Sequence, residues 1–200
     1  GAGEWGGGGG DLLLVGSGVG GEGVGTTRLG TSGGESARGV AFNPADGSYA
    51  VVGHTDGAMP GQSSAGGDDL FIIKFSAAGE AVWTTQLGSS SEDYAYGVAF
   101  NPADGSYAVV GSTDGALPGQ SSAGRRDLFI IKFSSAGEVV WTTQYGSSGF
   151  DAANGVACNL ADGSYAVVGD TLGGALPGQA SAGGYDLFII KVSSAGEVVW

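Results

Sequence analysis

The chain is built from tandem copies of a repeat of about 58 residues. The letters GVAFN at Gly39–Asn43 return at Gly97–Asn101 and, with a cysteine in place of the phenylalanine, at Gly155–Asn159. Between residues 39–96 and 97–154 roughly four positions in five are identical. A period this regular predicts a series of equivalent structural units, each of which packs against its neighbours.

Each copy contains four short apolar segments separated by turn residues. The first two are joined by Asp46-Gly47, a dipeptide typical of hairpins, and a loop of about 15 residues precedes the third. Two hairpins joined by a long loop predict a four-stranded antiparallel sheet. In the first full copy the expected strands span residues 38–42, 48–53, 69–75 and 80–87.

The third segment is apolar on both of its faces. Leu70 and Ile72 would point to one side, and Phe71 and Ile73 to the other. A sheet with one face in water alternates apolar and polar residues, so this sheet needs a neighbour on each face. Radially stacked blades provide those neighbours, whereas a parallel β-helix, the structural competitor, usually has far shorter coils. The sequence therefore predicts an all-β fold, a partial β-propeller of about three and a half blades.

Three tryptophans occupy one position in the last strand of successive units. Trp83, Trp141 and Trp200 are expected to pack between blades, because large aromatic side chains dominate such contacts. Cys158 replaces Phe42 and Phe100 of the other copies, so we expect a buried thiol there. A single cysteine leaves the cellular compartment open.

The motifs resemble those of a known family. Gly-Val-Ala-Phe-Asn, Leu-Pro-Gly-Gln, Asp-Leu-Phe-Ile-Ile-Lys-Phe and Gly-Glu-Val-Val-Trp-Thr-Thr-Gln recur in order over residues 11–200. This pattern is similar to the bacterial seven-bladed β-propeller repeat family (SBBP) and, more distantly, to NHL-type propellers. The resemblance implies that the strand containing Gly39 is innermost and that the strand containing Trp83 is outermost. It also implies an extracellular or cell-surface location.

That phasing divides the chain into units. We expect a glycine-rich, disordered N-terminus and then the two outer strands of a degenerate first blade, in which Gly16 and Gly25 replace larger residues. Three further blades follow, the last with a truncated final strand, and we expect the chain to be a fragment of a longer protein. The expected boundaries are 1–10, 11–36, 37–88, 95–146 and 153–200.

Composition limits the partners of the chain. With 20 acidic and seven basic residues the net charge is −13, which repels nucleic acid and anionic lipid. The apolar runs are only four to six residues long, so membrane insertion is not expected either. Open end blades would expose apolar faces, which predicts possible self-association.

No catalytic set can be assembled from these residues. His54 is the single histidine, its equivalents are Ser112 and Asp170, and we expect a solvated loop residue there. The glycine-rich stretch at residues 16–21 aligns with an ordinary hairpin, and no helix follows it, which argues against a phosphate loop. We therefore expect a protein that is not an enzyme.

The repeated aspartates are expected to be structural. They begin the third strand of each unit, where a carboxylate can accept backbone N–H groups; they are Asp11, Asp69, Asp127 and Asp186. The alternative is a calcium site formed by Asp56, Asp68 and Asp69. The spacing of a calcium loop is absent, and Asp68 becomes Arg126 in the next copy, so no cofactor is the preferred expectation.

Two groups of polar residues remain. Glu92, Asp93, Tyr94 and Tyr96 join two units, and such an acidic and aromatic set can hold a sugar ring. The three equivalent lysines are expected to extend their stems over apolar neighbours and to keep their amines in water; they are Lys74, Lys132 and Lys191.

The sequence thus favours a non-enzymatic propeller module of a larger secreted or surface protein, which acts as a scaffold or binds an unknown protein or carbohydrate. The alternative is a lyase or hydrolase whose catalytic residues lie in the central channel of a propeller, in blades outside this sequence.

Overall fold

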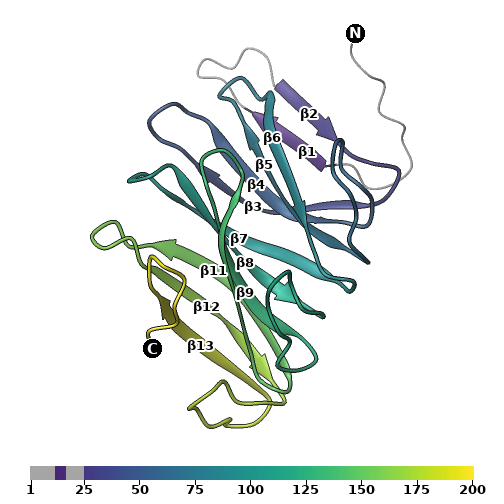
Figure 1. Cartoon of the computed structure of the whole chain (residues 1–200). Helices are drawn as coiled ribbons and strands as arrows, with labels where there is room; N and C mark the ends of the chain where they lie inside the picture. The colour runs from purple at the N-terminus through teal and green to yellow at the C-terminus, as the bar shows by residue number, and fades with distance from the viewer. Residues whose placement is uncertain (1–11, 17–24) are drawn as a thin grey trace.

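A computed structural model describes residues 12–16 and 25–200. This part of the chain forms four antiparallel sheets and contains no helix, and hence no helix able to span a membrane. The sheets follow one another along the chain and stack face to face (Figure 1). The first sheet contains β1 (Leu12–Gly16) and β2 (Gly25–Leu29); the second contains β3 (Glu35–Phe42), β4 (Tyr49–Thr55), β5 (Asp69–Phe75) and β6 (Ala81–Leu87); the third contains β7 (Asp93–Asn101), β8 (Ser106–Thr113), β9 (Asp127–Phe133) and β10 (Val139–Tyr145); the fourth contains β11 (Phe150–Cys158), β12 (Tyr165–Leu172) and β13 (Tyr185–Val192).

The predicted all-β fold is confirmed. The four strands of the second sheet lie within a few residues of the expected bounds, and β5 matches them fully. Each Asp-Gly hairpin has its glycine at positive φ, with 72° at Gly47, 72° at Gly105 and 70° at Gly163. The expected disordered segment 1–10 lies outside the described residues, as does Asp11.

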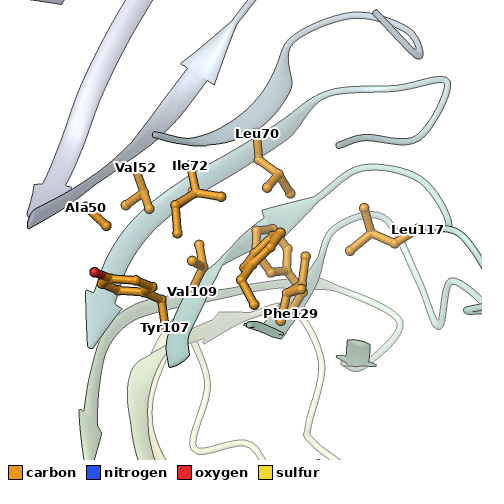
Figure 2. Close-up of a cluster of buried hydrophobic side chains, with 11 residues drawn as sticks. Ala50, Val52, Leu70, Ile72, Tyr107, Val109, Leu117 and Phe129 are labelled. Atoms are coloured by element: carbon orange, nitrogen blue, oxygen red, sulfur yellow. The ribbon is translucent and has the colours of Figure 1, made fainter. Parts of the chain in front are cut away.

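Apolar side chains from both faces of the second and third sheets build the core. One cluster joins Val52 and Ile72 of the second sheet to Tyr107, Val109 and Phe129 of the third (Figure 2). A second cluster joins the opposite face of the third sheet to the fourth sheet in the same way. The strands are apolar on both faces because the third sheet has a packed neighbour on each side.

Two of the three equivalent tryptophans lie across junctions between sheets. Trp83 Nε1 donates a hydrogen bond to the carbonyl oxygen of Ser135 at 3.0 Å, and the ring meets Tyr107 edge to face. Trp141 repeats both contacts on the fourth sheet, with Ser194 and Tyr165. Trp200 is 65% exposed, because no described sheet covers that side of the fourth sheet.

The uncovered face of the fourth sheet is apolar. Leu187 and Ile189 of β13 and Val168 of β12 are exposed there. Leu187 and Ile189 also line a cavity of about 560 Å³ together with Trp200. The residues equivalent to Leu187, Ile189 and Val168 in the second and third sheets are buried under the next sheet.

Candidate functional site

A β-bulge interrupts the first strand of the second, third and fourth sheets. The register shifts between Ala37 and Gly39 in β3, and at the equivalent positions of β7 and β11. A bulge leaves one residue unpaired and can redirect its side chain. The unpaired residues are Arg38, Tyr96 and Asn154, which differ from copy to copy although the surrounding residues repeat.

Each bulge residue lies near a second variable residue on the neighbouring strand. The Tyr96 hydroxyl hydrogen bonds with Ser112 Oγ at 3.2 Å. Asn154 Nδ2 donates to Asp170 Oδ1 at 2.6 Å. The equivalent of Ser112 and Asp170 in the second sheet is His54. The bulges therefore bring positions that break the repeat close together on the first two strands of each sheet.

Around the second and third sheets several of these variable residues, together with Asp114, form a continuous group, which we call the Tyr94 cluster. Its strands β4 and β7 supply the aromatic members, and the loops before β5, β7 and β9 supply most of the charged ones. The members are His54, Asp68, Glu92, Tyr94, Tyr96, Asp114 and Arg126.

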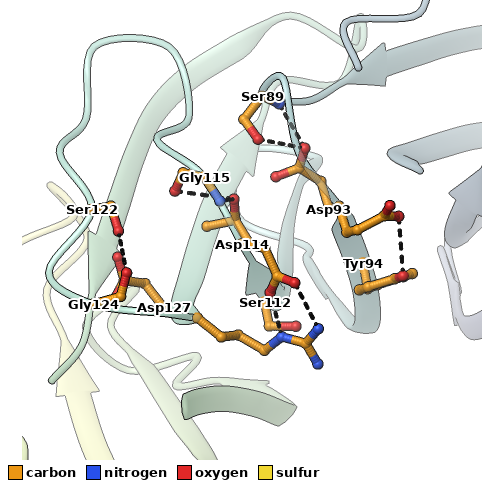
Figure 3. A network of polar contacts seen from close by, with 12 residues as sticks. Ser89, Asp93, Tyr94, Ser112, Asp114, Gly115, Ser122, Gly124 and Asp127 are labelled. Atoms are coloured by element: carbon orange, nitrogen blue, oxygen red, sulfur yellow. Dashed lines mark hydrogen bonds and ion pairs between the residues drawn. The ribbon is translucent and has the colours of Figure 1, made fainter. Parts of the chain in front are cut away.

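Tyr94 contacts four other members of the cluster, and Figure 3 shows the hydrogen bond of its hydroxyl. His54 meets the Tyr94 ring edge to face at a centroid distance of 4.7 Å, and the Tyr96 ring stacks at 6.3 Å. The Arg126 guanidinium lies 5.6 Å from the ring centroid, within the range of a cation–π contact. The Tyr94 hydroxyl donates to Glu92 Oε2 at 3.2 Å. The Tyr94 ring thus packs against three protein groups.

Two carboxylates set the electrostatics of the cluster. Glu92 Oε2 accepts the backbone N–H of Asp68 at 3.0 Å, and this hydrogen bond holds the pKa of Glu92 below its usual value. Burial and the neighbouring Glu92 raise the pKa of Asp68. Burial, followed by the negative charges of Glu92 and Asp68, raises the pKa of Tyr94. Burial lowers the pKa of His54, although the nearby acids oppose the shift.

A bidentate ion pair closes the other side of the cluster. Arg126 Nε and Nη2 donate to the two carboxylate oxygens of Asp114, at 2.5 and 3.0 Å (Figure 3). This hydrogen bond raises the pKa of Arg126. The pair fixes the guanidinium over Tyr94 and leaves Asp68 and Glu92 as the half-exposed acids of the cluster.

The structure places the residues that the sequence proposed for a ligand site in two different environments. Glu92, Tyr94 and Tyr96 lie together, whereas Asp93 is fully buried and accepts hydrogen bonds from Ser89. The prediction of a solvated loop for His54 is wrong: it belongs to β4 and is half-buried, because its ring packs against Tyr94.

The calcium candidates do not converge. Asp56 accepts the backbone N–H of Gly34, Asp68 faces Glu92, and Asp69 is buried beside Gln86. Among the described residues, no group of three histidine, cysteine or acidic side chains has the arrangement of a metal site.

The repeated aspartates hold the loops that precede the third strands. Oδ2 of Asp69, Asp127 and Asp186 accepts a backbone N–H from a residue four positions earlier, at 2.8 to 2.9 Å. The expectation for the lysines fails at Lys132, which is almost fully buried and donates to Asp104 Oδ2 at 2.7 Å. The Lys132 amine is therefore paired with the carboxylate of the Asp104-Gly105 turn and does not extend into water.

The pair Arg125-Arg126 marks a break in the repeat, where the other copies have Gly67-Asp68 and Gly184-Tyr185, and such breaks are where the sequence directs a search for function. Neither Arg126 nor its partner Asp114 was predicted from the sequence as a site residue. The sequence did not indicate that Arg126 lies over Tyr94, because 32 positions separate them and the contact depends on how the sheets stack.

No protein-family model matches the chain. The chain is similar to the regulatory protein FlaEY of Caulobacter vibrioides, with 31% identity over 174 residues. That match covers 80% of this chain but only 17% of the relative.

Among solved structures, a protein of unknown function from Bacteroides caccae has a TM-score of 0.41 at 12% identity, over 88% of this chain and 69% of that one. A mutant of the apocarotenoid oxygenase of Synechocystis has a TM-score of 0.45 at 12% identity, over 84% of this chain and 38% of that one.

Proposed function

We propose that this chain is a β-propeller repeat module without catalytic activity, and that it binds a polar ligand at the Tyr94 cluster. The observation that carries the proposal is the separation of constant from variable residues. Turns, core contacts and tryptophan contacts repeat from sheet to sheet, whereas variable side chains meet beside the bulges of the first strands. A repeat scaffold with one variable surface is the usual design of a binding module.

The stacking of the sheets supports the propeller as the architecture. In a propeller the first strands of successive blades lie side by side around the axis, and β3, β7 and β11 are neighbours in this order. Closed propellers generally have four to eight blades. The apolar face of the fourth sheet would then be covered by a further sheet of the same repeat or by a second copy of the chain.

The chemistry of the cluster favours a ligand with several hydroxyl groups. Asp68 and Glu92 offer carboxylate oxygens, and Tyr96 offers a hydroxyl group. The Tyr94 ring already packs against His54, Tyr96 and Arg126, so hydrogen bonds rather than stacking on Tyr94 would hold the ligand. A carbohydrate of a surface or secreted environment fits these groups, and a protein partner with hydroxyl or basic side chains is the alternative.

A binding screen tests this proposal. The purified chain is titrated with a panel of soluble oligosaccharides in a calorimeter, beside the variants Glu92→Gln and Glu138→Gln. Glu138 is an exposed acid of a hairpin turn and serves as the matched control. We expect one class of oligosaccharide to bind, Glu92→Gln to weaken binding at least about tenfold, and Glu138→Gln to leave it unchanged.

Equal binding by Glu92→Gln and the unmodified chain would remove the Tyr94 cluster as the binding site. Turnover of an oligosaccharide that persists through purification would instead favour the lyase or hydrolase alternative. The similarity to the regulatory protein FlaEY is consistent with a binding role, although the chain spans only 17% of that protein.

A further inference from the structure

Pairs of buried aspartates lie at the junctions between sheets, below the Tyr94 cluster. Asp69 begins β5 of the second sheet and Asp93 begins β7 of the third. Asp127 and Asp151 form the same pair between the third and fourth sheets. All four side chains are fully buried. Carboxylates are rarely buried in this way without a compensating partner.

Each pair has the same hydrogen bonds. Asp69 Oδ2 accepts the Ala65 backbone N–H at 2.8 Å and Gln86 Nε2 at 2.7 Å. Asp93 Oδ2 accepts the backbone N–H and the hydroxyl of Ser89, at 2.6 and 3.0 Å (Figure 3). The Oδ1 atoms of both aspartates have no hydrogen-bond partner among the described residues, and the same holds for Asp127 and Asp151.

The two carboxyl groups of a pair face one point. A Cβ atom added to Gly88 would lie 2.1 Å from Asp69 Oδ1 and 3.0 Å from Asp93 Oδ2. At Gly146 the corresponding distances are 2.3 Å to Asp127 Oδ1 and 3.0 Å to Asp151 Oδ2. The glycine is required because a side chain there would displace the carboxyl groups. Its recurrence shows that the paired geometry belongs to the repeat.

The groups that donate hydrogen bonds to the Asp69–Asp93 pair carry no positive charge. The groups around it are Gln86 from β6, Ser89 from the loop before β7 and Thr113 from β8, all of them uncharged. Two ionised carboxylates side by side in a buried site repel each other and lose their hydration. Burial raises the pKa of Asp93, and the charge of Asp69 adds to this shift, although the nearby Thr113 hydroxyl and the hydrogen bonds from Ser89 oppose it.

We propose that the Asp69–Asp93 pair is a proton-binding site at the junction of the second and third sheets. Asp93 holds a proton over a pH range in which an exposed aspartate is ionised. The proton removes one of the two like charges of the buried pair. When the proton leaves, the two charges push the starts of β5 and β7 apart and weaken the packing of the sheets.

The sign of the pH dependence follows from linkage. The folded chain binds this proton more tightly than the unfolded chain, so the stabilisation is fully present below the aspartate pKa of the unfolded state. It is lost as the pH rises through the raised folded pKa, and stability then becomes constant. A junction of this kind is tighter in acid than at neutral pH.

The experiment combines carboxyl NMR with unfolding. The Asp93 side-chain carboxyl carbon is followed by ¹³C NMR from about pH 3 to about pH 9, and urea unfolding is measured over the same range. We expect Asp93 to titrate at least about one pH unit above exposed aspartates of the same chain. Asp93→Asn removes the charge and keeps a donor, so it should flatten the fall in stability at high pH.

Asp186→Asn is the matched control, because Asp186 occupies the repeat position of Asp69 but is only partly buried. It should leave the slope unchanged. An ordinary titration of Asp93 in the unmodified chain overturns the proposal, even if Asp93→Asn fails to fold. A higher urea midpoint with calcium chloride than with a chelator at pH 8, without a raised Asp93 titration, would also overturn it and assign a cation to the pair.

Discussion

The third and fourth sheets contain almost the same strand in two different environments. Residues 127–133 read DLFIIKF and residues 186–192 read DLFIIKV. Every residue of β9 is buried, whereas Leu187 and Ile189 of β13 are exposed. The third sheet has a packed sheet on each face and the fourth has one. The apolar pattern on both faces of a strand therefore predicts that the strand can be packed on both faces. It does not predict which copies of the repeat have a neighbouring sheet on each face.

The largest expected effect on stability is at one leucine position, which is buried in β9 and exposed in β13. Leu128 is 0% exposed and Leu187 is 82% exposed, although both follow the first aspartate of the strand. We expect Leu128→Ala to lower the free energy of unfolding by about 3 kcal/mol, because it removes buried methyl groups and leaves a cavity. Leu187→Ala should change it by less than about 0.5 kcal/mol, because a surface side chain loses little on truncation.

Urea denaturation of both variants measures this difference. Equal losses at the two positions would contradict the comparison, and would mean that another molecule covers the fourth sheet in solution. Sedimentation of the unmodified chain separates the two cases, because a covering copy of the chain doubles the mass. Loss of that association in Leu187→Ala would then locate the interface on β13.

A second comparison uses the tryptophans. Trp141 lies across the junction with the fourth sheet, where its ring meets Tyr165 and its Nε1 donates to Ser194. Trp200 occupies the same repeat position and is largely exposed. We expect Trp141→Ala to cost about 2 kcal/mol, less than a fully buried tryptophan because the ring is only partly covered.

Trp200→Ala should cost less than about 0.5 kcal/mol in the same assay. Trp141→Phe separates the two contributions, because it keeps the ring contact and removes the hydrogen bond. If Trp141→Phe lost as much as Trp141→Ala, the Ser194 hydrogen bond rather than the ring would hold the junction.

The repeat explains why so much of the fold could be predicted. The continuous apolar run Leu70–Ile73, the Asp46-Gly47 turn and the position of Trp83 are local signals, and the copies repeat them. The Tyr94 cluster was only partly predictable. Glu92, Tyr94 and Tyr96 are close in sequence, but His54 and Arg126 reach them through the stacking of sheets, which no short motif encodes.

Buried polar groups were the least predictable features. Asp69 reads as a turn residue and Asp93 as part of a linker, and only the junction of two sheets brings their carboxyl groups to Gly88. Lys132 reads as a solvated lysine because its partner Asp104 lies 28 positions away. Such contacts depend on the depth of a side chain between sheets, which the apolar pattern does not specify.

The smallest expected effect concerns two equivalent ion pairs, Lys132 with Asp104 and Lys191 with Asp162, at 2.7 and 3.1 Å. Burial raises the pKa of Asp104, but hydrogen bonds from Lys132 and then Ser106 outweigh it and hold the pKa below its usual value. Asp162 has a pKa of about 2, held there first by the hydroxyl and N–H of Ser164 and only then by Lys191.

The order of these causes predicts different responses to loss of the lysine. Lys132→Met should raise the pKa of Asp104 clearly, whereas Lys191→Met should raise the pKa of Asp162 only slightly, since Ser164 still binds that carboxylate. A depressed pKa stabilises the fold above the unfolded aspartate value and loses that effect as the pH falls through the folded value. Lys132→Met should therefore reduce the loss of stability in acid more than Lys191→Met does. Carboxyl NMR titration of both variants measures the shifts, and equal shifts would mean that the turn serines, not the buried amine, control both aspartates.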